Sequence, residues 1–149
     1  MKVALVAHGD NPPYLKDLFN GEGFELIEKE CNNEKEYVDL LKDADGALIY
    51  LHPLTTREIM EQCDNLKVIS RGGVGVDSVD LEAATELGIC ICNTPGINTT
   101  EVADHAMALL LSLTRKIREQ DSLVKKGYWA DRTELIHPYR SELGRIAGN

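Results

Sequence analysis

The sequence has few of the features that mark nucleic-acid-binding or membrane proteins. Basic residues are in the minority, with 16 Lys and Arg against 25 Asp and Glu, and the net charge of −9 repels nucleic-acid phosphates and anionic lipid surfaces. No apolar run reaches the roughly 20 residues that a bilayer requires, and the N-terminus lacks the length and cleavage site of a signal peptide. We therefore expect a cytoplasmic protein without nucleic-acid or membrane partners.

Cysteine is scarce, and its spacing does not indicate zinc or thioredoxin-like chemistry. The four cysteines include no C-x-x-C pair; Cys31 and Cys63 precede polar turns, while Cys90 and Cys92 stand two apart in an apolar run. We expect small buried side chains in a reducing compartment, with a reactive role as the alternative. Because neither metal-ligand spacing nor a nucleophile paired with a base is present, we predict no metal site and assign no catalytic residue.

What is present is the composition of an ordinary globular protein. The chain has 149 residues, 43% hydrophobic and 28% charged, and it contains no internal repeat or low-complexity tract. The charge is unevenly distributed, because residues 1–98 carry a net charge of −10 and residues 99–149 carry +1. This difference predicts two structural units that meet near residue 98.

Short apolar runs rich in β-branched residues alternate with segments of helical spacing in the first unit. The runs predict five strands, at 3–8, 24–27, 47–52, 66–70 and 89–92. Helices are predicted between them, at 14–19, 35–41, 56–63 and 81–87, the last stopped by Gly88. This alternation predicts an α/β fold, with a parallel sheet and helices on both of its faces. The second strand is polar enough for an edge and the others are apolar enough for burial on both faces, which fits the flavodoxin-like order 2-1-3-4-5.

A different pattern begins at Asn98. Asn98 and Glu101 have capping-box spacing, and the helix predicted after them continues to Lys126, where Gly127 supplies a stop. Residues 102–113 are apolar nearly all round, so this part is expected to be a core helix, whereas 115–126 are charged and amphipathic. The remainder has no clear period and is expected to be an irregular arm.

The segment from Arg71 to Asp77 is the strongest candidate for a binding site. Gly72, Gly73 and Gly75 leave main-chain N–H groups uncovered and permit positive φ, which can form an anion-binding concavity at the carboxyl end of a sheet. Two alternatives remain open. The segment could be a tight turn that merely needs glycine, or the start of a G-x-G-x-x-G dinucleotide fingerprint, which fails at its third glycine because Ser78 stands there.

Other polar residues are expected near the same edge of the sheet. Asn98 follows the fifth strand, where its amide could orient a carboxylate or a cofactor amide, or serve only as a helix cap. His8 and His52 end the first and third strands and are expected at the edge of the crevice. His105 lies in the apolar helix, where a hydrogen-bonded core role is expected.

The stretch from Leu66 to Arg118 closely resembles the D-isomer-specific 2-hydroxyacid dehydrogenases, nearest the phosphoglycerate dehydrogenase and hydroxypyruvate reductase branch. The resemblance rests on VISRGGVGVD at 68–77, LEAA at 81–84, NTPG at 93–96 and EVADHAMALLL at 101–111. Residues 1–65 also resemble the flavodoxin-like substrate-binding domain of that family, and the Gly-Tyr-Trp at 127–129 resembles the glycine-x-tryptophan that follows its long helix.

The resemblance implies roles for particular residues. Arg71 and the backbone from Gly72 to Gly75 are expected to bind the carboxylate of a 2-oxo or 2-hydroxy acid, with Asn98 facing the same pocket. Val74 is expected between substrate and nicotinamide, and Val102 near the cofactor, which is NAD by resemblance, with NADP as the alternative.

Two departures from the family pattern limit the expected activity. An arginine that can hold a substrate phosphate commonly follows the third strand in the phosphoglycerate branch, but this chain has LHPLTT at 51–56. In the family, the catalytic arginine, acid and histidine belong to an NAD-binding domain that follows the arm, and this chain stops near that point. We therefore expect the truncated substrate-binding portion of such an enzyme, inactive alone, with domains at 1–98 and 99–149.

Alternatives and partners follow from the same residues. A non-catalytic flavodoxin-like small-acid sensor is the alternative function. A signalling receiver is disfavoured because it needs an aspartate and a lysine where His52 and Thr94 stand. Since the apolar helix would lack a burial partner without the NAD domain, we expect a homo-oligomer formed through the 100–126 helix and the arm containing Trp129.

Overall fold

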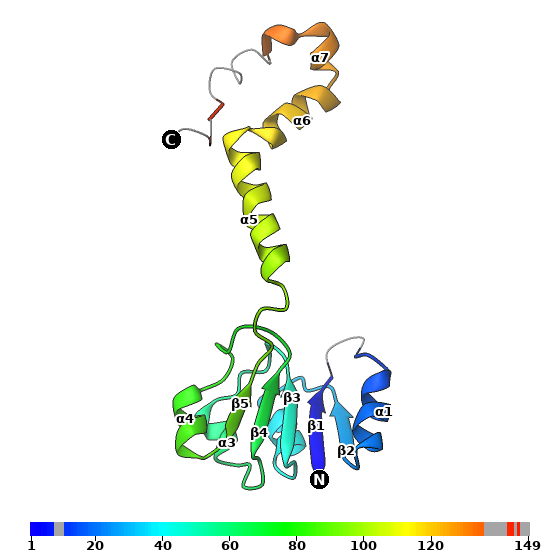
Figure 1. Cartoon of the computed structure of the whole chain (residues 1–149), viewed down its shortest axis with the longest axis vertical. Helices are drawn as coiled ribbons and strands as arrows, with labels where there is room; N and C mark the ends of the chain where they lie inside the picture. Colours follow the sequence, from blue (N-terminus) through cyan, green and yellow to red (C-terminus); the bar gives the residue numbers. More distant parts are fainter. Residues whose placement is uncertain (8–10, 136–142, 145, 147–149) are drawn as a thin grey trace. The chain divides into compact units, whose positions relative to one another are not determined.

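The computed structural model describes residues 1–7, 11–135, 143–144 and 146, and the chain divides into two compact units, Met1–Ile97 and Asn98–Asn149 (Figure 1). In the first unit five parallel strands form one sheet in the order β2-β1-β3-β4-β5, which confirms the predicted order. The strands are β1 (Lys2–Val6), β2 (Glu25–Lys29), β3 (Gly46–Ile49), β4 (Val68–Arg71) and β5 (Cys90–Cys92). The helices between them are α1 (Tyr14–Gly21), α2 (Glu34–Leu41), α3 (Arg57–Met60) and α4 (Leu81–Glu86).

The hydrophobic core lies on one face of this sheet. Ala4, Ala47 and Ile69 are aligned across β1, β3 and β4, and all three are buried. They belong to one cluster with buried residues of α2, α3 and α4, including Tyr37 and Ile59. The small alanines at the centre of the sheet leave room for these larger side chains of the helices.

The opposite face is covered only in part. Leu5 of β1 is buried and lines a small cavity together with Leu15 of α1. Across the same row of the sheet, Leu48 and Ser70 are half-buried and Cys92 is exposed. Strand β5 was predicted to be buried on both faces, and this prediction is wrong because it is the second edge of the sheet and is exposed on this face.

The cysteines are correspondingly less buried than the sequence suggested. Only Cys63 is buried, Cys31 is half-buried, and Cys90 and Cys92 are exposed. The prediction that all four are small buried side chains is therefore wrong for the pair on β5, because the alternation of a strand turns both away from the core.

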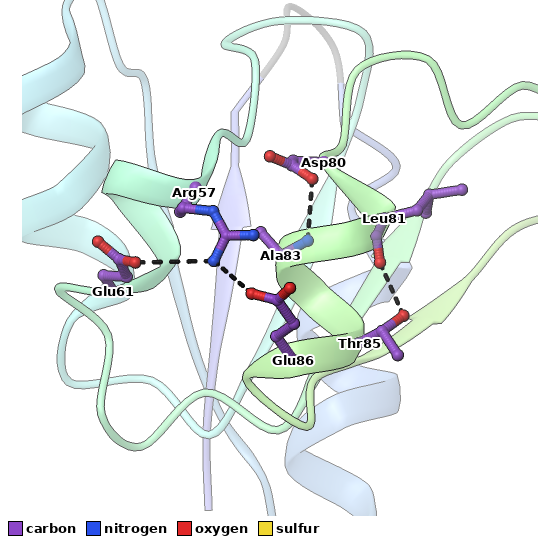
Figure 2. A network of polar contacts seen from close by, with 7 residues as sticks. All are labelled: Arg57, Glu61, Asp80, Leu81, Ala83, Thr85 and Glu86. Carbon is purple, nitrogen blue, oxygen red and sulfur yellow. Dashed lines mark hydrogen bonds and ion pairs between the residues drawn. The ribbon is translucent and has the colours of Figure 1, made fainter.

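Helices α3 and α4 are joined at the surface by an ion pair. Arg57 Nη1 lies 2.7 Å from Glu86 Oε2 and 3.9 Å from Glu61 Oε1 (Figure 2). Asp80 caps α4, because its Oδ1 accepts a hydrogen bond of 2.9 Å from the N–H of Ala83. The helix stops before Gly88, which has a φ of 72°, as the sequence predicted.

The second unit contains two helices where one was predicted. Helix α5 (Thr99–Thr114) and helix α6 (Ile117–Lys125) are separated by Lys116, which has a left-handed φ of 49°. The Thr114 hydroxyl donates to the carbonyl of Leu110 at 2.8 Å, and the N–H of Lys116 turns back to the Leu113 carbonyl at 3.3 Å. This local bonding ends α5, so the predicted continuous helix through residue 126 is wrong.

Burial in the second unit also differs from expectation. None of the residues of α5 is buried, and His105 is exposed, so neither the core helix nor the core histidine is observed. Asn98 stands at the N-cap but its side chain makes no capping bond, which contradicts the predicted capping box. Gly127, with a φ of 78°, ends α6 as predicted.

The predicted irregular arm begins with two short helical segments. These are α7 (Tyr128–Asp131) and the 3-10 helix η1 (Thr133–Leu135), while residues 136–142 lie outside the described part of the chain. No helix in the described ranges is both long enough and apolar enough to cross a membrane.

Candidate functional site

The glycine turn, residues 72–77, begins where β4 ends at Arg71. The N–H of Gly72 donates to the carbonyl of Ile49 at 2.8 Å, and the N–H of Thr94 donates to the carbonyl of Gly73 at 3.0 Å. These bonds hold the turn between the end of β3 and the segment that follows β5, at the carboxyl edge of the sheet, where the arrowheads of the strands lie in Figure 1. This is the edge at which open α/β sheets bind ligands.

Asn93 is a constituent of this site that the sequence reasoning missed. Its Nδ2 donates a hydrogen bond of 2.7 Å to the carbonyl oxygen of Val74, and the residue follows directly after β5. A signal for it was present, since an amide at the end of a strand neighbouring the turn is placed to contact it. Asn93 therefore joins two loops of the candidate site.

The turn needs its glycines for space rather than for positive φ. A Cβ on Gly72 would lie 2.8 Å from Cε1 of Tyr50, and a Cβ on Gly73 would overlap the guanidinium group of Arg71. The positive-φ glycines among the described residues are elsewhere in the chain, at Gly23, Gly88, Gly96 and Gly127. The requirement is a close approach of side chains to the backbone.

The hydrogen bonds narrow the part of the turn that can receive an anion. The N–H groups of Gly72 and Gly73 already donate to Ile49 and Arg71 carbonyls, both at 2.8 Å. In the described part of the chain, the N–H groups of Val74 and Gly75 have no such bond. The candidate anion donors are therefore these two groups rather than the whole run from Gly72 to Gly75.

Arg71 adds a charged donor to the turn. Its guanidinium group folds back over Gly73, and its Nε is buried with no hydrogen-bond partner among the residues that the structure describes. A buried donor without a partner costs about 1–3 kcal/mol, so a ligand that accepts this bond is favoured. Asp77 places a carboxylate beside the same turn, because its Oδ2 lies 3.1 Å from where a Cβ on Gly75 would stand.

A layer of buried residues, Tyr37, Thr55 and Ser78, holds the end of the glycine turn in place. The N–H of Thr55 donates to the carbonyl of Ser78 at 2.7 Å, and the N–H of Asp80 donates to the carbonyl of Thr55 at 3.0 Å. The hydroxyl groups of Tyr37 and Thr55 share a bond of 2.6 Å, and burial raises the pKa of Tyr37 to about 12. Ser78, which replaces the third glycine of the dinucleotide pattern, is itself buried in this layer.

A separate cavity lies at the carboxyl ends of β1, β2 and β3. Its volume is about 490 Å³, and His52 lines it as expected for the edge of the crevice, whereas His8 lies outside the described residues. The other lining residues are Val6, Ala7, Glu30, Cys31, Asn32, Asn33, Glu34, Pro53, Leu54, Thr56 and Ile59. None of them belongs to the glycine turn. Within the described ranges, no group of three or more His, Cys, Asp or Glu residues could hold a metal ion.

Comparison with known proteins identifies the family. The family model described as D-isomer specific 2-hydroxyacid dehydrogenase, catalytic domain, matches residues 3–133. The chain belongs to this family. A D-3-phosphoglycerate dehydrogenase of Archaeoglobus fulgidus is 36% identical over 132 residues, which cover 89% of this chain and 25% of that protein. This chain thus spans about a quarter of the length of that relative.

Solved structures of dehydrogenases share the fold of this chain. The NAD-dependent formate dehydrogenase of Staphylococcus aureus, in complex with NAD, has a TM-score of 0.74 and 31% identity, covering 93% of this chain and 45% of that one. The NAD+-bound 3-phosphoglycerate dehydrogenase of Entamoeba histolytica has a TM-score of 0.66 and 26% identity, covering 78% of this chain and 40% of that one.

The remaining predicted site residues belong to the second unit. Asn98 precedes α5, and Val102, 60% exposed, lies in its first turn with its N–H bonded to the Asn98 carbonyl at 3.0 Å. The approach of Asn98 and Val102 to the glycine turn depends on how the two units are arranged, and it stays a prediction.

Proposed function

We propose that residues 1–98 form the substrate-binding domain of an NAD-dependent D-2-hydroxyacid dehydrogenase, which interconverts a 2-hydroxy acid and a 2-oxo acid. The observation that carries the proposal is Arg71, whose buried Nε has no partner in the described part of the chain and lies beside a turn with two free N–H groups. A carboxylate has the two oxygens needed to accept bonds from both kinds of donor.

Substrate would bind at the glycine turn through its carboxylate. One carboxylate oxygen accepts from the Arg71 guanidinium group and the other from the N–H groups of Val74 and Gly75. Asn93 holds the Val74 carbonyl at 2.7 Å and thereby sets the position of the neighbouring Gly75 N–H. The negative charge of Asp77 near Gly75 opposes the binding of any anion there, so the positive charge of Arg71 is needed for the carboxylate to bind.

The glycine turn and the N-terminus of α4 do not fit a dinucleotide. Ser78 stands in place of the third fingerprint glycine and is buried, and the N-terminus of α4 is already capped by Asp80. We infer that another part of the whole protein holds NAD, and that residues 99–149 form the helices and arm leading to it. The exposed Val74 and Val102 would be the contacts of this chain with the nicotinamide end.

Catalysis by these 149 residues alone is not expected. In the described ranges, neither His52 nor His105 forms an ion pair with a carboxylate, so no acid–base pair of the kind that protonates a 2-oxo group is assembled. A purified sample that reduced hydroxypyruvate or glyoxylate with NADH at enzymic rates would contradict this.

The carboxylate site is tested by calorimetric titration of the purified chain with glyoxylate and hydroxypyruvate. We expect weak binding that Arg71→Gln abolishes, because the variant removes the charge. Arg118→Gln, which removes an exposed arginine of the second unit, is the matched control and should bind as the wild type does. Equal binding by Arg71→Gln would overturn the proposed site, and micromolar affinity without cofactor would favour the small-acid sensor instead.

We also propose that the chain forms a homo-oligomer through residues 100–126 and the Trp129 arm. Support comes from exposed apolar side chains: Leu109 is 59% exposed, Leu113 78% and Trp129 57%. Exposed apolar area of this kind is typical of an interface. Light scattering should show a dimer or larger species that Leu109→Glu/Leu113→Glu dissociates, and a clean monomer of the wild type at high concentration would refute the proposal.

A further inference from the structure

Cys90 and Cys92 present two thiols on the same exposed face of β5. Side chains alternate along a strand, and Ile91 between the two cysteines packs against the core, so both thiols point away from the core. Both cysteines are exposed, and their neighbours across the sheet are Val68 and Ser70 of β4. The pair therefore lies on an exposed part of the sheet.

The two thiols lie two residues apart on one face of the same strand, and both are exposed. The other two cysteines differ, because Cys63 donates to the Ile59 carbonyl at 3.2 Å and Cys31 to the Lys29 carbonyl at 3.8 Å. Only the β5 pair combines exposure with a second thiol as the neighbour.

The strand geometry favours binding of one metal ion by both thiols over formation of a disulfide between them. Two steps along a strand separate the Cα atoms by roughly 6.6 Å, and the two Cα–Cβ bonds run side by side instead of converging as a disulfide requires. Two sulfurs that share a metal ion stand farther apart, at up to about twice a metal–sulfur bond of roughly 2.3 Å. The side chains reach that separation by leaning toward each other without movement of the backbone.

We propose that Cys90 and Cys92 form a two-coordinate site for a soft, thiophilic cation, with Cu(I) as the fitting ion. Thiolates select soft metals, and Cu(I) accepts two sulfur ligands in a linear arrangement. Zinc does not fit, because it takes four ligands and no third His, Cys, Asp or Glu joins the pair in the described structure. On binding, each thiol releases its proton to solvent and forms one sulfur–copper bond, and copper remains Cu(I), so no oxidant or reductant is required.

The test is a competition for Cu(I) between the reduced full chain and the chromophoric chelator bicinchoninate, under anaerobic conditions. We expect the wild type to remove one equivalent of Cu(I) from the chelator. Cys90→Ser and Cys92→Ser should each weaken the affinity by about tenfold or more, because either change leaves one ligand and removes the chelate effect. The matched control is Cys31→Ser/Cys63→Ser, which also removes two thiols but keeps the β5 pair.

Two results would overturn the site. One is a Cys90→Ser/Cys92→Ser variant, shown by circular dichroism to be folded, that competes as well as the wild type. The other is a monomer that loses two mass units on mild oxidation and yields a Cys90–Cys92 disulfide peptide, since the strand geometry forbids that bond. The Cys90→Ala and Cys92→Ala variants repeat the measurement should serine disturb the edge strand. None of these readouts depends on the proposed dehydrogenase function.

Discussion

Asn93 and Val74 are joined by a hydrogen bond of 2.7 Å from the Asn93 Nδ2 to the Val74 carbonyl oxygen. Together with the bond from the Thr94 N–H to the Gly73 carbonyl at 3.0 Å, it ties two consecutive carbonyl groups of the glycine turn to the segment after β5. Between Gly72 and Gly75, the N–H groups that make no backbone hydrogen bond in the described part of the chain are those of Val74 and Gly75. The turn is therefore positioned from outside by β5 as well as by its own glycines.

Asn93→Ala should weaken binding of a 2-oxo acid more than it weakens folding. The variant frees the Val74 carbonyl, and because the bond is exposed, loss of a net hydrogen bond of about 1 kcal/mol is the largest expected effect on stability. A similar loss of free energy in the bound state corresponds to roughly fivefold to tenfold weaker binding of glyoxylate. Calorimetry and urea unfolding measure the two effects. Asn65→Ala is the control, because it removes an exposed amide that precedes the amino end of β4, whereas the turn follows the carboxyl end. Equal affinities of all three proteins would contradict the role of Asn93.

Gly73→Ala should abolish carboxylate binding at little cost in stability. The added Cβ overlaps the end of the Arg71 side chain, which is half-buried but flexible, so the guanidinium group is displaced from the turn. Removal of the guanidinium group from the turn should reduce affinity as much as Arg71→Gln does, and the double variant should show no further loss. If Gly73→Ala still bound the acid while Arg71→Gln did not, the displacement of Arg71 by the added Cβ would be contradicted.

Gly72→Ala provides the contrast, because its Cβ meets the ring of Tyr50 instead of a flexible chain end. The contact at 2.8 Å from Cε1 requires the ring to move, and overpacking of this kind costs about 1–3 kcal/mol. Gly21→Ala in α1, where nothing lies within 4 Å, should be neutral or stabilising. If urea unfolding gave the same stability for Gly72→Ala and Gly21→Ala, the close packing of Tyr50 on the turn would be contradicted.

The sheet could be predicted from the sequence because its signals are local. Apolar runs separated by helical spacing gave all five strands in the right order, and Gly88 and Gly127 marked two helix ends that the structure confirms. The break at Lys116 has no such signal, since neither glycine nor proline stands there. It results from hydrogen bonds of Thr114 and the last turn of α5, which no hydrophobic period reveals.

Burial was harder to predict because it depends on what covers each face. Cys90 and Cys92 lie in an apolar run, yet β5 is an edge strand and the face they occupy is open in the described structure. For the candidate site, the sequence indicated the glycines and Arg71. The sequence did not reveal the hydrogen bond between Asn93 and Val74, because it joins residues that only the fold brings together. It also did not reveal that the N–H groups of Gly72 and Gly73 are already hydrogen-bonded, because this depends on the backbone conformation of the turn.

Asp80→Ala should destabilise the chain through the start of α4. The variant removes the bond of 2.9 Å to the Ala83 N–H, and loss of an N-cap side chain typically costs about 1 kcal/mol. Asp80→Asn is the matched variant, because asparagine caps a helix about as well as aspartate, and it should lose only a few tenths of a kcal/mol. If both variants lost the same stability in urea unfolding, the loss would come from removal of the negative charge and not from loss of the cap.

Tyr37→Phe should change how stability depends on alkaline pH. Burial is the main cause that raises the pKa of Tyr37 from its ordinary value of 10.0 to about 12. Between these pH values the unfolded state has lost the phenolic proton while the folded state keeps it, so the stability contribution is complete below pH 10 and falls as pH rises toward 12. A shift of this size corresponds to a loss of about 2–3 kcal/mol across that range. Unfolding measured from pH 8 to 11.5 should show a shallower decline in Tyr37→Phe than in the wild type.

Cys63 must be held constant in that comparison, because burial raises its pKa from 9.0 to about 11 and it contributes its own loss of stability over an overlapping range. Both proteins retain Cys63, so the difference between their slopes isolates Tyr37. At neutral pH Tyr37→Phe should cost about 1–3 kcal/mol, because the Thr55 hydroxyl is left buried without its partner. Adding Thr55→Val should recover part of that cost, since both polar partners are then gone. Parallel slopes above pH 10 would show that Tyr37 is not shielded from solvent in the folded chain.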